Sequence, residues 1–230
     1  MPTLVQLKIA DYASLSNGST IAFDSNITSG NTIVVLGLHS YAGCPPSLSD
    51  GLGNTYSPKG TRPSLNTEIV EIFTAPITVG GACTVTTAMS CGLFRNFAMA
   101  EVSGLKADPF DQQNGTYNAS ASSPFAAGSI TPAEAGEYIF ALFSSGGSGR
   151  DLSDGGGAGL TERGNNTNND CTILDKTHTS GAINPDVSFA GGALLMRGVV
   201  ASFKATPSAP SKFAPPNKLR PRIFAPGLAR

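Results

Sequence analysis

The chain has 230 residues, of which 40% are hydrophobic and 13% are charged, with 27 glycines and 16 prolines. This length is enough for one sizeable core, and the low charged content excludes long amphipathic helices, whose polar faces need many Glu, Lys and Arg residues. The net charge of −1 at pH 7 combines two unequal parts. Residues 205–230 carry five basic side chains and no acid, whereas the rest of the chain carries ten basic and sixteen acidic ones.

Apolar segments of strand length, bounded by turn residues, recur along the chain. The strongest, rich in β-branched and aromatic residues, predict strands at Thr32–His39, Glu68–Phe73, Cys83–Thr87, Phe97–Val102, Glu137–Phe143, Cys171–Asp175 and Ala193–Phe203. Weaker patterns predict strands at Leu4–Ile9, Thr20–Phe23, Tyr56–Lys59, Gly115–Ala119 and Val187–Ala190. Two segments, "TIVVL" and "EYIFALF", are almost continuously apolar, which is typical of strands covered on both faces.

Two segments resemble each other within the chain. Residues 27–42 and 130–146 both read Ile-Thr, a turn with glycine, a polar residue, a hydrophobic strand and a loop of small residues. Related halves are expected of an all-β domain built from two Greek keys. Ser144–Gly159, rich in glycine with Leu152 as its apolar anchor, and Asn165–Asp170 are predicted to be loops at an edge or tip.

The cysteines and the first residues indicate whether the thiols are expected to be reduced or bridged. Cys44, Cys83, Cys91 and Cys171 show no Cys-x-x-Cys spacing and no neighbouring histidine, so no zinc site is predicted. The first residues lack a secretory signal pattern, so we expect buried reduced thiols, with a bridge between Cys83 and Cys91 left open. No apolar run is long enough to predict a membrane span.

Few residues suit catalysis. His39 and His178 are the two histidines, and the sequence has no recognised nucleophile, zinc or phosphate-loop motif. Glu68 and Glu71 are three residues apart and are predicted to point to opposite sheet faces. Glu101 is predicted to be buried, with Arg95 or Arg197 as an ion-pair partner. We therefore expect no enzyme, no catalytic residue, no metal and no cofactor.

Six segments in a characteristic order resemble a family of jelly-roll-like β-sandwich domains found in tailed-phage virion structural proteins, across roughly residues 3–205. These segments are "SGNTIVVLGLHS" (29–40), "SDGLGNTY" (49–56), "VGGACTVTT" (79–87), "MAEVSGLKADPFDQ" (99–112), "TPAEAGEYIFALF" (131–143) and "GGALLMRGVVASFKA" (191–205). The resemblance implies an antiparallel sandwich without a cofactor or an active site, in capsid decoration (cement) proteins or in fibre and receptor-binding proteins. We divide the chain into a sandwich domain at 1–204 and an extended arm at 205–230.

The arm is the predicted binding element. Prolines favour an extended conformation that loses little entropy on docking, and apolar and basic side chains alternate between them. The residues expected to contact a partner are Lys212, Phe213, Lys218, Leu219, Arg220, Arg222, Ile223, Phe224, Leu228 and Arg230. The expected partners are the major capsid protein or other virion proteins and further copies of the chain, with a homotrimer favoured, in a virion assembled in the host cytoplasm.

Two other functions remain open at this point. A tail-fibre, head-spike or receptor-binding protein would use the glycine-rich and asparagine-rich loops to touch the host, including a surface glycan. A carbohydrate-binding module is disfavoured because the chain has no tryptophan and only five tyrosines for stacking on sugars. Specific nucleic-acid binding is not expected, because the body is acidic and a short basic arm gives mainly salt-sensitive, non-specific affinity.

Overall fold

The computed structural model describes residues 1–10, 15–40, 43–145, 151–165 and 170–207. All regular secondary structure within these residues is β, and every strand pair is antiparallel. The strands are β1 (Thr3–Ala10), β2 (Thr20–Ala22), β3 (Thr32–Ser40), β4 (Ser47–Asp50), β5 (Ser57–Pro58), β6 (Ser64–Leu65), β7 (Glu68–Pro76), β8 (Thr84–Ala88), β9 (Phe94–Ser103), β10 (Leu105–Ala121), β11 (Phe125–Ala126), β12 (Glu137–Ser145), β13 (Ser153–Asp154), β14 (Thr161–Asn165), β15 (Cys171–His178), β16 (Asp186–Ser188) and β17 (Leu194–Ala205).

These strands form four sheets. The first large sheet has the order β1-β9-β3-β7-β5, with β6 also paired to β7, and the first small sheet has the order β2-β8-β4. The second large sheet has the order β10-β17-β12-β15-β14, and the second small sheet has the order β11-β16-β13. The predicted all-β sandwich class is confirmed, whereas its finer assignment as a jelly roll stays a prediction.

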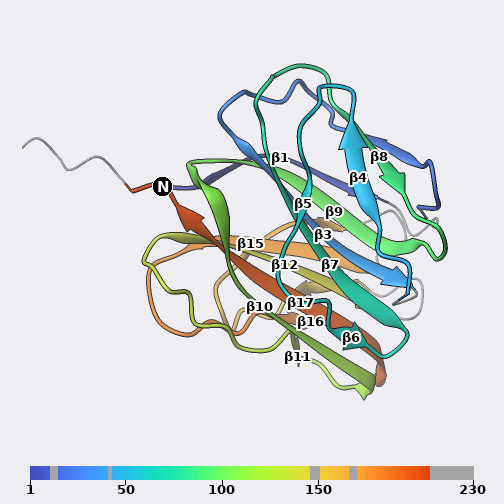
Figure 1. Cartoon of the computed structure of the whole chain (residues 1–230). Helices are drawn as coiled ribbons and strands as arrows, with labels where there is room; N and C mark the ends of the chain where they lie inside the picture. Colours follow the sequence, from blue (N-terminus) through green and yellow to red (C-terminus); the bar gives the residue numbers. More distant parts are fainter. Residues whose placement is uncertain (11–14, 41–42, 146–150, 166–169, 208–230) are drawn as a thin grey trace, which may run out of the picture.

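The chain contains the same arrangement twice. Each of the strands β10 to β17 takes the place in its sheet that a strand of the first half takes, so that β12 corresponds to β3 and β17 to β9. Thr32 and Glu137, which begin β3 and β12, are 105 positions apart, and Phe94 and Leu194, which begin β9 and β17, are 100 apart. The two segments whose sequences resemble each other contain β3 and β12, at equivalent positions in the two halves (Figure 1).

Three hydrophobic clusters separate the four sheets. The central cluster lies between the large sheets and joins alternate residues of β3, such as Leu36, to residues of β12, such as Phe140. Each outer cluster fills the space between one large sheet and its small sheet, with Val35 in the first and Ile139 in the second. Successive side chains of a strand point to opposite faces, so β3 and β12 supply two cores each. Their nearly continuous apolar sequences are therefore explained, as predicted, by the burial of both faces of each strand.

Every predicted strand overlaps an observed one, but five observed strands were not predicted: β4, β6, β11, β13 and β14. They are short, and β14 is charged on an exposed edge, so no apolar pattern marks them. The loop predicted at Ser144–Gly159 is partly wrong, because its first two residues belong to β12 and Ser153–Asp154 forms β13. Its apolar anchor is confirmed, since Leu152 is buried in the second outer cluster.

The halves also contact each other along their edges, and they do so reciprocally. The first strand of the first half, β1, lies against the second half: Thr177 on β15 donates a hydrogen bond to the carbonyl of Pro2, and Gly164 on β14 faces Ile9. The first strand of the second half, β10, lies against the first half, where Gln113 donates to the carbonyl of Thr61 at 2.7 Å. Each half thus covers an edge of the other, as subunits of a twofold dimer do.

The cysteine expectation needs correction. Cys44 and Cys91 form a disulfide with a Cα–Cα distance of 5.5 Å, which ties the loop after β3 to the loop before β9. Cys83 is buried as a free thiol, as is Cys171, so the bridge left open between Cys83 and Cys91 does not form. Spacing along the sequence did not indicate the bridge between Cys44 and Cys91, because the antiparallel pairing of β3 with β9 brings loops that are distant in the sequence to the same end of the sheet.

Candidate functional site

The predicted binding arm begins at the edge of the described structure. The structure describes the first three residues of the arm, Ala205, Thr206 and Pro207. The ten residues expected to contact a partner lie outside the described residues: Lys212, Phe213, Lys218, Leu219, Arg220, Arg222, Ile223, Phe224, Leu228 and Arg230. What the structure defines is therefore the root from which the arm leaves the body.

The root is fixed to the junction between the two halves. The backbone N–H of Thr206 donates to the carbonyl of Gly104 at 2.8 Å, and its hydroxyl donates to the carbonyl of Leu105 at 2.8 Å. Gly104, which connects β9 to β10, has a φ of 72°, a conformation that favours glycine. The arm therefore leaves from the point at which the chain passes from the first half into the second.

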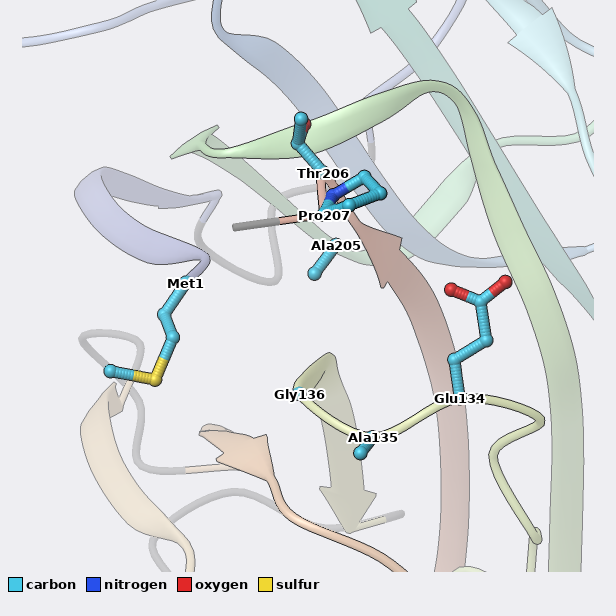
Figure 2. Close-up of a pocket in the computed structure, with 7 residues that line it drawn as sticks. All are labelled: Met1, Glu134, Ala135, Gly136, Ala205, Thr206 and Pro207. Carbon is cyan, nitrogen blue, oxygen red and sulfur yellow. The ribbon is translucent and has the colours of Figure 1, made fainter. Parts of the chain in front are cut away.

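A pocket of about 310 Å³ lies beside this root. Figure 2 shows its lining residues arranged in a ring, with Met1 and Glu134 on opposite sides of the opening. The ring consists of Met1, Glu134, Ala135, Gly136, Ala205, Thr206 and Pro207. Three separate segments, namely the first residue, the loop before β12 and the root, thus meet at one place.

The rim of this pocket is charged. Lys106 on β10 donates to both carboxylate oxygens of Glu134 at 2.7 Å. Close by in the same sheet, the Nζ atom of Lys204 lies 3.0 Å from Oδ1 of Asp111. Burial alone would raise the pKa of Asp111, but the hydrogen bonds from the N–H of Ala133 and from Lys204 together outweigh it and hold the pKa of that carboxyl below its usual range.

A shallower depression of about 330 Å³ lies on β10, between Gly60, Thr61 and residues 110–113. It presents the ring of Phe110 and the amides of Gln112 and Gln113. Neither hollow contains a histidine or a cysteine. Within the part of the chain that the structure describes, no three histidine, cysteine or acidic side chains gather as metal ligands do.

The carboxylates singled out in the sequence occupy structural positions. Glu68 and Glu71 do point to opposite faces of β7, as predicted: Glu68 pairs with Arg197 at 3.3 Å between the large sheets. On the opposite face, Glu71 accepts hydrogen bonds from Arg62, with His39 at 4.0 Å. All of these side chains except Arg62 are nearly or fully buried.

Glu101 is buried as predicted, but the expected arginine partner is wrong. Gln6 donates to its Oε2 at 2.6 Å, while Asn31 and the backbone N–H of Thr28 donate to its Oε1 at 2.6 and 2.8 Å. Three donors from uncharged groups satisfy this carboxylate. Its role is to fasten β1 and the loop before β3 onto β9.

The two histidines are also placed within the fold. His39 is fully buried beside the ring of Phe94, with the ring centroids 5.5 Å apart, and burial together with the charge of Arg62 lowers its pKa. His178, at the end of β15, donates a 3.0 Å hydrogen bond from Nε2 to the carbonyl of Gly181. Neither histidine lines a pocket described above.

The comparisons with known proteins add no family: no family model, no curated protein and no solved structure matches the chain. The described residues contain no helix with the length and apolar character needed to cross a bilayer.

Sequence reasoning did not find the group formed by Asp111, Glu137 and Lys204. Asp111 lies in a polar stretch of a long edge strand, Glu137 begins a predicted strand, and Lys204 lies one residue beyond the end of another. Only the sheet order β10-β17-β12 places them together. No local pattern in the sequence carries that information.

Proposed function

We propose that the protein is a non-enzymatic phage virion protein that decorates a capsid and docks through its C-terminal arm. The observation that carries the proposal is a contrast between two parts of the chain. The body is a folded β-sandwich with hydrogen-bonded side chains, whereas the arm is basic and rich in proline and begins at a root that is hydrogen-bonded to the body. Outside the arm, charged side chains number ten basic against sixteen acidic, so arm and body suit different surfaces.

The composition of the arm supports a docking role. Each proline restricts the backbone before binding, so an extended arm loses less conformational entropy when it settles on a partner. Phe213, Ile223 and Phe224 are candidates for apolar pockets, and Arg220 and Arg222 for pairing with acids on the partner. The anchored root transmits that attachment to the body through Thr206.

The experiment uses particles from the genome that encodes this chain, assembled without it. Purified full-length chain and a variant lacking residues 208–230, which keeps the root, are added to the particles and separated by sedimentation. We expect the full chain to cosediment with heads and the truncated body to remain in the supernatant, with unchanged circular dichroism. A truncated body that decorates heads at full occupancy would refute the role of the arm.

A second variant separates charge from shape. Replacing the five basic residues of the arm by glutamine keeps its length, its prolines and its apolar side chains. We expect weaker attachment that no longer depends on salt concentration. Imaging of the particles locates the chain, and a position on the tail instead of the head would favour a fibre or receptor-binding protein and overturn the decoration proposal.

A further inference from the structure

Three neighbouring strands of the second large sheet bring a lysine and two carboxyl groups together at one end of the sheet. Lys204 is on the middle strand β17, Asp111 is on β10 and Glu137 is on β12. The register of β10 with β17 shifts between Phe110 and Gln112, so Asp111 lies in a bulge. A bulge redirects a side chain, and here Oδ1 of Asp111 lies 3.0 Å from Nζ of Lys204.

Glu137 is the fully buried member of this group. Its Oε1 accepts a 2.9 Å hydrogen bond from the backbone N–H of Glu134, whereas its Oε2 makes no hydrogen bond of ordinary geometry among the described residues, although the Ser202 hydroxyl is a neighbour of this carboxyl. Burial raises the pKa of Glu137 and the adjacent Asp111 carboxylate raises it further, while the N–H of Glu134 and the hydroxyl of Ser202 act in the opposite direction. The raised pKa shifts Glu137 towards its protonated form, the form that can donate a proton to Asp111.

Asp111 is held in position from another side. The backbone N–H of Ala133 donates to its Oδ2 at 2.8 Å. The side chain of Asp111 is 8% exposed and that of Lys204 is 29% exposed. A carboxyl group with an amine beside it, an N–H on one oxygen and a neighbouring acid has the groups that acyl transfer needs.

The equivalent corner of the first half shows what an ordinary structural arrangement looks like. There Glu101 on β9 is satisfied by Gln6, Asn31 and the N–H of Thr28, and no lysine contacts it. The second half instead places a primary amine against a carboxyl group, and an oxygen of Glu137 makes no hydrogen bond of ordinary geometry among the described residues. A buried polar atom without a partner calls for an explanation.

We propose that Lys204 and Asp111 become joined by an intramolecular amide bond, with Glu137 as the acid that assists its formation. The ammonium of Lys204 first passes a proton to the Asp111 carboxylate, which gives a neutral amine and a neutral acid. The amine then attacks Cγ of Asp111. Glu137 protonates the departing hydroxyl and recovers a proton from the nitrogen. One C–N bond forms, one C–O bond breaks and one water leaves, without any redox change.

The ion pair determines the speed of this reaction. Pairing with Asp111 raises the pKa of Lys204, so the neutral amine is a minor population and the bond forms slowly. Proximity acts in the opposite direction, because reacting groups held in contact have effective concentrations of roughly 10⁵ M or more. We therefore expect the bond to accumulate after folding, during incubation of the native protein.

The test is the intact mass of the purified, reduced full-length chain, measured under denaturing conditions after increasing times of native incubation. We expect a product lighter by one water, and protease digestion to yield a branched peptide joining the segments around Lys204 and Asp111. The peptide map is essential, because cyclisation at Asp50–Gly51 or Asp154–Gly155 loses the same mass. A chain that keeps its full sequence mass throughout would overturn the proposal.

Three variants make the assignment specific. Lys204→Arg keeps the ion pair but cannot form this amide, and Glu137→Gln removes the acid, so both are expected to keep the full mass. Lys106→Arg, at the neighbouring pair with Glu134, is expected to form the bond as the unaltered chain does. Circular dichroism checks that each variant folds. If Glu137→Gln does not fold, Lys204→Arg alone tests the assignment. Water loss that persists in Lys204→Arg would also refute the assignment. This bond lies within the body, so its test does not depend on what the arm binds.

Discussion

Arg197 connects the two large sheets at the level of single side chains. Its Nε atom lies 3.3 Å from a carboxylate oxygen of Glu68 and donates to the carbonyl of Leu65, and its guanidinium lies 5.7 Å from the centre of the Tyr117 ring. Arg197 and Glu68 are only 6% and 5% exposed. A charge removed from water to this extent depends on its partner, because the remaining charge has little solvent to stabilise it.

We expect Arg197→Met to lower the free energy of unfolding by about 3–5 kcal/mol, since the buried Glu68 carboxyl loses the cation that acts on it most strongly and keeps only the weaker influence of Arg95. Urea unfolding followed by circular dichroism measures the loss. The double variant with Glu68→Gln should recover part of it, because the buried charge is then gone. Lys8→Met, which removes the exposed pair with Asp24, is the matched control and should change stability by less than about 1 kcal/mol. Equal effects of the two single variants would contradict this account.

The side chains also show where sequence reasoning succeeds and where it stops. The opposite directions of Glu68 and Glu71 were predictable, because side-chain direction along a strand depends only on spacing. The partner of Glu101 was not, because it depends on which strand lies next to β9 and on the loop before β3. Arg197, one of the candidates for that role, pairs across the central core instead.

At the scale of elements, the turn after β4 has a counterpart after β13. Residues 48–53 read "LSDGLG" and residues 152–157 read "LSDGGG". In both turns the aspartate accepts a hydrogen bond from the N–H two residues later, at 2.9 Å for Asp50 and 3.1 Å for Asp154. Only the first aspartate also binds the side chains of Asn54 and Tyr56, so the two copies differ in how firmly they are held.

This pair of turns provides its own control. We expect Asp50→Ala to lower the free energy of unfolding by about 2–3 kcal/mol, because the amide and hydroxyl that it binds are left without an acceptor in a part-buried site. Asp154→Ala removes the single bond of an exposed turn and should lower it by less than about 1 kcal/mol. Thermal unfolding of both variants measures the difference. A larger effect at Asp154 would show that the Asn54 and Tyr56 bonds contribute little.

The elements themselves were predictable wherever burial leaves an apolar pattern. The strands that supply the cores, such as β3, β7 and β12, follow from their apolar residues. The extent of β10 was not predictable, because this 17-residue strand is largely polar and lies at an edge of its sheet. The group of Asp111, Glu137 and Lys204 depends on that strand, so this group could not be predicted from the sequence either.

At the scale of the whole molecule, two copies of one strand arrangement share a central core. Each large sheet is covered on one face by its own small sheet and on the other by the large sheet of the second copy. The sequence indicated the repetition through the pair of segments that contain β3 and β12, and the turns after β4 and β13 are a second resembling pair. The strand order of the sheets makes the repetition plain.

We expect neither half to be a stable monomer alone. A fragment of residues 1–103 would expose the face that carries Leu36 and Val70, and a fragment of residues 105–207 the face that carries Phe140 and Phe203. Apolar faces of this size favour association or aggregation. Size-exclusion chromatography of each fragment, and of the two expressed together, measures the outcome. A fragment that is monomeric and unfolds cooperatively would contradict the dependence of each half on the other.

The pairing of β1 with β9 has a consequence for how the chain is made. Thr3 lies opposite Ser103, so β1 pairs with a strand that is made about a hundred residues later. At roughly 5–20 residues per second, β1 waits about 5–20 seconds for that strand, and the central core waits about twice as long for β17. The interval between the synthesis of β1 and a finished core is thus set by strand order, and slower translation prolongs the time for which the apolar strands stay uncovered.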